Sequence, residues 1–124
     1  MRKLLFSMLL VAFTFVGAEP AAAQDAGGEA VTLTAQVIDF SCALVQGATG
    51  EDHRACAQAC ADMGQPLGFL TESGDFLLPV NQGMGAEGMN GELRPFAEQD
   101  VTVTGRVIER GGVNAIVVEE IAGA

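Results

Sequence analysis

The chain has little positive charge and only one histidine. Its 124 residues include 6 Lys or Arg against 16 Asp or Glu, which gives a formal net charge of −10 at pH 7. Affinity for nucleic acid depends largely on Lys and Arg neutralising phosphates, so this balance argues against a nucleic-acid partner. With one histidine and no Gly-x-Ser-x-Gly segment, the sequence offers no recognisable nucleophile, base and orienting group, which favours a protein that is not an enzyme.

Cysteine is scarce as well, and its number is odd. Three cysteines cannot all pair within one chain, so one thiol is left over even in an oxidising compartment. Two of them, Cys56 and Cys60, lie within eight positions of the only histidine, His53. The third, Cys42, precedes them by a short segment. This grouping makes the cysteines candidates for more than structural cross-linking.

The first 23 residues have the pattern of a secretory signal peptide. Arg2 and Lys3 precede an apolar run over 4–16, and residues 21–23 offer an Ala-x-Ala cleavage site. The run is shorter than the roughly 20 residues that a membrane-spanning helix needs. We therefore expect a periplasmic or secreted protein that keeps no membrane anchor after cleavage.

The remaining residues are enough for one small core. We expect 24–30 to be a disordered lead-in, because it is short, polar and glycine-containing. Residues 31–124 are then predicted to form a single domain, since a chain of that length does not build two cores.

Alternating apolar and polar residues predict five strands. "VTLTAQVIDF" over 31–40 predicts the first strand, and 67–80 predicts a hairpin that turns at 72–75. Two longer strands follow around Arg110-Gly111-Gly112, and a short helical turn is expected before them, limited by Pro95. Gly105, in the middle of a strand, predicts a bulge. The inward faces of the last two strands are predicted to carry Val101, Val103 and Val107, and Val113, Ala115 and Val117.

A helix is predicted in the loop after the first strand. Thr49 and Asp52 have the spacing of a capping box, and Gly64 with Pro66 provides a stop. The segment between them has the length of about three helical turns.

The order of these elements resembles the OB-fold. The resemblance lies in "VTLTAQVID" at the start and "DVTVTGRVIERGGVNAIVVEEI" at the end. It implies a mainly β protein with one inserted helix, built as a small five-stranded Greek-key barrel. The C-x13-C-x3-C spacing, with "GEDH" and "GQPLG", also resembles small exported bacterial proteins of OB-like type with a Cys/His-bearing helix. In ordinary OB-folds the loop after the first strand contributes to the ligand-binding face, and here that loop carries the cysteines.

The predicted helix places its soft ligands on one side. At 100° per residue, His53, Cys56, Cys60 and Met63 share an arc of about 80°. The opposite side takes Glu51, Arg54, Gln58 and Asp62. We expect the cysteine side to face the sheet, where Cys42 would approach from the end of the first strand.

Three thiolates and one imidazole form a complete tetrahedral set for zinc, and thiolates with a thioether also suit Cu(I). The predicted metal site is therefore Cys42, His53, Cys56 and Cys60, with Met63 as an additional candidate ligand. The C-x3-C spacing with a nearby His and Met resembles the binuclear copper centre of cytochrome oxidase and the copper assembly proteins in ligand chemistry alone. The predicted function is metal binding, either structural zinc or the handling of zinc or copper, with a periplasmic protein as a further candidate partner.

Two alternatives remain open on the same residues. A disulfide from Cys42 to Cys56 or Cys60 would tie the helix to the barrel, leaving a binding module that docks a protein or peptide. A reversible cysteine pair would instead make the chain a thiol redox protein.

Overall fold

The computed structural model describes residues 27–83 and 88–124. The expected signal peptide over 1–23 lies outside the described residues. The first strand begins at Glu29, inside the segment expected to be a lead-in. No helix among the described residues combines the length and the apolar composition that crossing a membrane requires.

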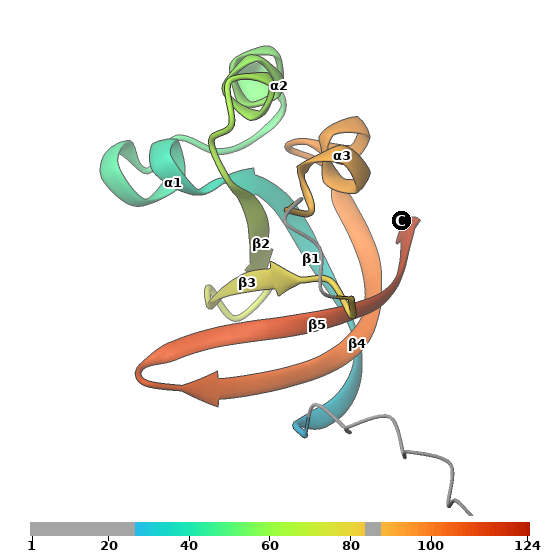
Figure 1. The fold of residues 1–124 in the computed structure, drawn as a ribbon. Helices are drawn as coiled ribbons and strands as arrows, with labels where there is room; N and C mark the ends of the chain where they lie inside the picture. The colour runs from blue at the N-terminus through green and yellow to red at the C-terminus, as the bar shows by residue number, and fades with distance from the viewer. Residues whose placement is uncertain (1–26, 84–87) are drawn as a thin grey trace, which may run out of the picture.

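Among the described residues, five strands occur along the chain, with helical segments after the first and the third of them (Figure 1). The first half contains β1 (Glu29–Asp39), α1 (Phe40–Gln46), the 3-10 turn η1 (Glu51–His53), α2 (Arg54–Asp62) and β2 (Leu67–Thr71). The second half contains β3 (Phe76–Val80), α3 (Asn90–Leu93), the 3-10 turn η2 (Arg94–Phe96), β4 (Asp100–Arg110) and β5 (Val113–Gly123). The predicted hairpin over 67–80 and the helical turn before the last two strands are confirmed.

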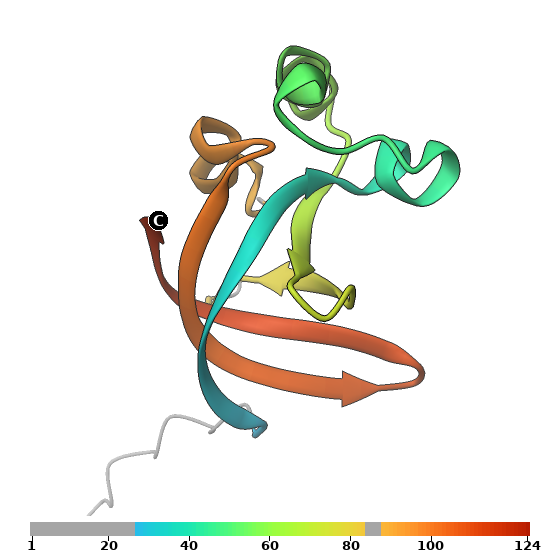
Figure 2. The same ribbon diagram turned by 180° about the vertical axis from the view of Figure 1, so that it is seen from behind.

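The strands close into a barrel in the order β1-β2-β3-β5-β4. All neighbouring pairs are antiparallel except β3 and β5, which run parallel. Figures 1 and 2 show β1 curving along the full height of the barrel and the β4–β5 hairpin extending away from the helices. The predicted fold class, a mainly β five-stranded OB-like barrel with an inserted helical segment, is confirmed.

The β4–β5 hairpin corrects one prediction about the core. Ile116 and Val118 belong to the buried core of β5, whereas Val113 is 50 % exposed, so the predicted inward face of β5 is wrong. The cause is the register. Val107 pairs with Ile116, and residues directly opposite on antiparallel strands point to the same side of the sheet. Because Ile116, Val117 and Val118 are all apolar, the sequence alone allowed either the odd-numbered or the even-numbered residues of β5 to point inward.

Gly105 forms the predicted bulge. The register between β4 and β5 shifts between Thr104 and Gly105, so that Glu119 is an extra residue on β5. A Cβ atom at Gly105 would overlap the carbonyl oxygen of Val117. Glycine is required here because the two backbones approach too closely for any side chain.

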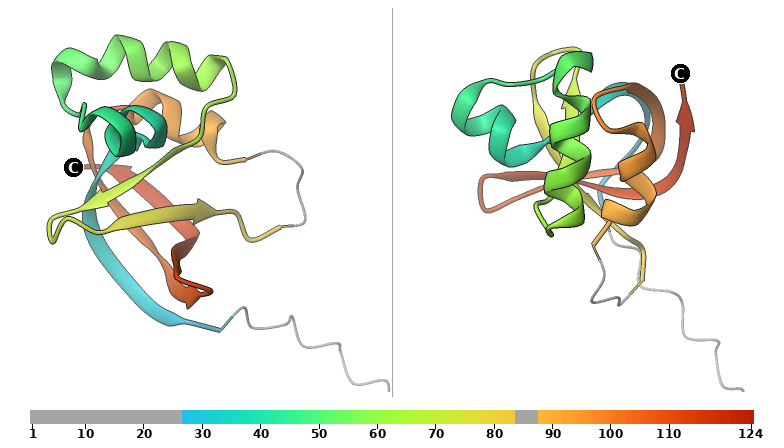
Figure 3. Two further views of the ribbon diagram at one scale, coloured as in Figure 1. Left: turned by 90° about the vertical axis from the view of Figure 1, so that its left-hand side faces the viewer. Right: turned by 90° about the horizontal axis from the view of Figure 1, so that it is seen from above.

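The helical segments gather at one end of the barrel. Figure 3 shows α2 crossing that end, with α1 on one side and α3 on the other. Residues 40–66, which connect β1 to β2 and contain α1, η1 and α2, are called the cap from here on. The predicted capping box is wrong. The residue before η1 is Gly50, at φ 102°, and no side chain caps η1 or α2.

Candidate metal centre

The helix α1, which the sequence reading did not predict, positions Cys42. It begins after Asp39, whose Oδ1 atom accepts hydrogen bonds from the backbone N–H groups of Ser41 (2.8 Å) and Cys42 (3.2 Å). An Asp that caps the first turn stabilises a helix start in this way. The helix ends at Gly47, which has the left-handed conformation common after a helix. Cys42 thus lies on the first turn of a helix and not on the strand.

An aromatic contact fixes α1 against the barrel. The ring of Phe40 lies so close to Gly68 of β2 that a Cβ at Gly68 would overlap it. The same ring lies 6.0 Å from the ring centroid of Phe76. Cys42, two residues after Phe40, is therefore held in place by the packing of the Phe40 ring as well as by the hydrogen bonds to Asp39.

The helix α2 has three different sides. Ala57 and Ala61 are its buried residues and face the barrel. A second side of α2 carries Gln58 and Asp62, which both contact Arg94. The side chain of Gln58 donates a hydrogen bond to the backbone carbonyl oxygen of Arg94 (3.3 Å), and Nη2 of Arg94 donates one to Oδ2 of Asp62 (2.7 Å). Cys56, on the third side, is exposed. The prediction that the cysteine side faces the sheet is therefore wrong, because small alanines let the helix pack closely there.

Two groups of ligand atoms meet on the third side of α2. One atom each of Cys42, His53 and Cys56 lie within 4.8 Å of one another, and so do one atom each of Asp39, Cys42 and Cys60. Cys42 belongs to both groups. In a tetrahedral zinc site with Zn–S bonds of about 2.3 Å, the sulfurs lie roughly 3.8 Å apart. Small side-chain rotations would therefore bring ligand atoms that lie within 4.8 Å of one another to the spacing of such a site. The three cysteines are free in the structure.

The predicted ligands are distributed over both groups. Cys42, His53 and Cys56 form the first, called the histidine triad below, and Cys60 joins Cys42 in the second, called the aspartate triad. Met63 is 76 % exposed and belongs to neither group. Asp39 was not predicted as a ligand. Its place directly before "FSCALVQ" was the available signal, because Asp is a preferred residue before a helix.

Two buried polar atoms in these triads have no hydrogen-bond partner. They are Oδ2 of Asp39 and Nε2 of His53, and no other buried side-chain nitrogen or oxygen of the described residues lacks a partner. Buried polar atoms are nearly always satisfied in folded proteins, so these two atoms are candidates for binding a ligand. His53 belongs to the histidine triad and Asp39 to the aspartate triad, so each triad contains one of these two residues.

Glu98 ties the backbone on both sides of α1 to the barrel. Its side chain is buried, with 3 % of the residue exposed, and its Oε2 atom accepts a hydrogen bond from the N–H of Gly50 at 2.7 Å. Its Oε1 atom accepts a weaker one from the N–H of Asp39 at 3.4 Å. Glu98 also has a φ of 58°, which is unusual for a residue other than glycine. A carboxylate far away in the sequence thus fixes the backbone next to the candidate metal centre.

The surroundings of the triads keep two of the thiols protonated. Hydrogen bonding to Asp39 and burial raise the pKa of Cys60 to about 12. Burial, followed by the charge of Asp39, raises the pKa of the Cys42 thiol above its usual value. A metal ion would have to replace these protons, because thiolates and not thiols are metal ligands.

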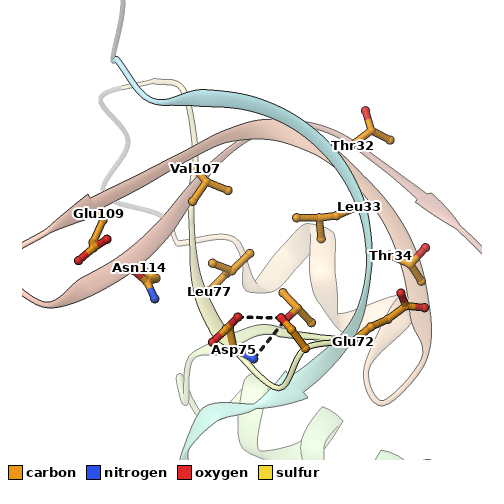
Figure 4. A pocket seen from close by; sticks show the side chains of 11 residues that line it. Thr32, Leu33, Thr34, Glu72, Asp75, Leu77, Val107, Glu109 and Asn114 are labelled. Carbon is orange, nitrogen blue, oxygen red and sulfur yellow. Dashed lines mark hydrogen bonds between the residues drawn. The ribbon is translucent and has the colours of Figure 1, made fainter.

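A second feature lies away from the cysteines. A cleft of about 860 Å³ opens between β1, the β2–β3 turn and the β4–β5 hairpin. Figure 4 shows Leu33, Leu77 and Val107 pointing into it. The carboxylates of Glu72, Asp75 and Glu109 line it as well, and none of the described residues that line it is basic.

Comparisons of this chain with protein-family models, with curated proteins and with solved structures found no match. The function is therefore inferred from the geometry and chemistry of the residues themselves.

Proposed function

We propose that this chain is an exported metal-binding protein that holds zinc or Cu(I) at the histidine triad. The observation that carries the proposal is the convergence of Cys42, His53 and Cys56 within 4.8 Å, in a triad whose buried His53 Nε2 has no other partner. Two thiolates and an imidazole suit both ions, and zinc sites with three protein ligands leave a fourth position for water or a further ligand.

The unpartnered nitrogen of His53 favours a metal over the two thiol-based alternatives. A disulfide between Cys42 and either other cysteine would use the sulfurs but leave the buried Nε2 of His53 without a partner among the described residues. A reversible redox pair would leave it equally unsatisfied. An ion bound by this nitrogen removes that cost.

The fold favours metal handling over a structural metal. The buried core consists of apolar residues from the strands, α2 and α3, and the barrel closes without the triads. Cys56 is exposed, so a bound ion remains within reach of the solvent. Structural zinc sites are normally closed, with four protein ligands.

The test is metal analysis combined with thiol counting. The full chain would be expressed with its own N-terminus, purified from the periplasm, and analysed by mass spectrometry for metal and for the start of the mature chain. We expect bound zinc or copper, a mature chain that begins at Gln24, and thiols of Cys42 and Cys56 that become reactive only after chelation.

Variants make the assignment specific. Cys42→Ser and His53→Ala should lose metal, whereas Met63→Leu, in an exposed residue outside both triads, should keep the content of the parent protein. Metal content unchanged in both Cys42→Ser and His53→Ala would refute the proposal. A metal-free protein with one free thiol would support the disulfide-tied module instead.

The cleft supports a second candidate function, a binding module for a basic peptide. Its apolar residues could bury an aliphatic side chain, while Glu72, Asp75 and Glu109 would attract lysine or arginine. A labelled peptide that alternates Lys and Leu should bind with an affinity that falls in Glu109→Gln and at high salt. Binding that ignores both changes would reject this candidate.

A further inference from the structure

We propose that the aspartate triad binds a second zinc ion, so that the sulfur of Cys42 bridges two metals. This inference rests on the proposed function, because the first ion is the one held by the histidine triad. The single observation behind it is that Asp39, Cys42 and Cys60 bring one ligand atom each within 4.8 Å, while Cys42 also belongs to the histidine triad.

Asp39 has a buried oxygen that no nitrogen or oxygen donor of the described residues uses. The residue is fully buried, with 0 % exposed, and its Oδ1 atom is occupied by the two N–H groups at the start of α1. Within 27–83 and 88–124, no nitrogen or oxygen donor gives a hydrogen bond to its Oδ2 atom. A carboxylate can accept hydrogen bonds from a helix start with one oxygen and bind a metal with the other. The hydrogen bonds of Asp39 to α1 therefore do not compete with the second ion.

The charges of the two triads balance with two ions. One Zn²⁺ on the histidine triad is neutralised by the thiolates of Cys42 and Cys56, which leaves the buried Asp39 carboxylate without a counter-charge other than the N–H groups of α1. A second Zn²⁺ is neutralised by Asp39 and the thiolate of Cys60. Since an uncompensated buried charge is costly, the state with two ions is the balanced one. When the second ion binds, the Cys60 thiol releases its proton to the solvent.

The chemistry of the second triad selects zinc over copper. Asp39 offers a carboxylate, a hard oxygen ligand that zinc accepts beside thiolates, whereas Cu(I) prefers sulfur. Each ion would have three protein ligands, and the fourth position of each remains for water.

Counting zinc ions per chain tests the inference separately from the proposed function. Zinc would be titrated into the purified, chelator-treated protein and counted by native mass spectrometry. We expect two ions per chain. One ion per chain would overturn the second site and leave the proposed function standing, and none would overturn the second site and, if Cu(I) also fails to bind, the proposed function.

Variants assign each ion to its triad. Asp39→Asn keeps a residue that can cap α1 and should reduce the count from two to one, as should Cys60→Ser. His53→Gln should also leave one ion, and Cys42→Ser should lose both. The matched control Glu120→Gln, which removes an exposed carboxylate of β5, should keep two. A count of two in Cys60→Ser would place the second ion elsewhere on the acidic surface and refute the inference, even if Asp39→Asn fails to fold.

Cobalt provides a test of the bridge itself. Two Co²⁺ ions that share a thiolate couple magnetically, so the paramagnetism per cobalt should fall between the first and the second equivalent. Cys60→Ser should show the uncoupled signal throughout. An unchanged signal per cobalt in the parent protein would refute the shared Cys42 sulfur.

Discussion

Different interactions stabilise the barrel and the cap. The barrel is closed by strand pairing around a core of buried apolar side chains such as Phe69, Leu93 and Ile116. The cap consists of short helices that pack on the barrel through Phe40, Ala57 and Ala61. Polar contacts of Asp39, Glu98 and Arg94 add to this packing. The two buried polar atoms without a partner among the described residues, Oδ2 of Asp39 and Nε2 of His53, lie in the cap or directly before it, and the candidate metal centre lies there too.

The largest effect should come from breaking the barrel. Phe69 is the largest fully buried side chain, and Phe69→Ala should cost about 3–5 kcal/mol in free energy of unfolding, because it leaves a cavity. Urea denaturation followed by circular dichroism measures this loss. Barrel and cap should unfold together in this variant. A cost below about 1 kcal/mol, typical of surface positions, would contradict the assigned core.

A change at Glu98 should loosen the cap and spare the barrel. Glu98→Gln removes the charge that accepts hydrogen bonds from the N–H groups of Gly50 and Asp39, at a cost of about 1–3 kcal/mol. Hydrogen exchange should become faster over residues 40–66 and stay unchanged in β4 and β5, and zinc should bind more weakly. The control is Glu120→Gln, at an exposed position. Equal acceleration in both regions would mean that the cap and the barrel are one cooperative unit.

Acidification should release metal from the cap without affecting the barrel. Because the pKa values of Cys42 and Cys60 are raised, zinc must displace their protons at neutral pH. The apparent zinc affinity should therefore fall as the pH is lowered, by up to about tenfold per pH unit for each proton displaced. Titration calorimetry in buffers of different ionisation enthalpy counts these protons. Zinc affinity that is constant between pH 6 and pH 8 would argue against thiolate ligands.

The smallest effect is expected where the cap meets η2. Asp62 and Arg94 form an ion pair whose side chains remain 55 % and 44 % exposed, so salt should screen it. Hydrogen bonding to Arg94 lowers the pKa of Asp62, and the stability that the pair adds is present above the ordinary Asp pKa and lost as the pH falls through the lowered one. Asp62→Asn should therefore be slightly less stable than the parent near pH 7 and equal to it at strongly acidic pH. A difference that persists in acid would point to a role other than the ion pair.

The barrel could be predicted from the sequence because its signals are local. Alternation in β1 and β4, the turn at Gly111-Gly112 and the bulge at Gly105 each depend on a few neighbouring residues. The inward face of β5 could not be assigned in the same way, because Ile116, Val117 and Val118 are all apolar. Only the pairing of β5 with β4 decides which of them are inside.

The sequence predicted which residues come close together in the candidate site, but not their arrangement. The spacing of His53, Cys56 and Cys60 pointed to candidate ligands, since neighbours on a helix recur every three or four residues, and each of the three lies in a group close enough to hold a metal. It did not give the orientation of α2, which depends on how closely Ala57 and Ala61 pack against the barrel. Glu98 could not be found at all. It follows Asp39 by 59 positions, and its backbone conformation leaves no pattern in the sequence.

The contact between Phe40 and Gly68 makes the position of Cys42 depend on a glycine that has no reactive side chain. Gly68 is a strand residue with no polar side chain, yet one added methyl group there would push the Phe40 ring and, with it, the turn that presents Cys42. Selection for metal binding would therefore act on a glycine that never touches the ion. A redesign of the cap for a different ligand would have to begin from the volume available beside β2.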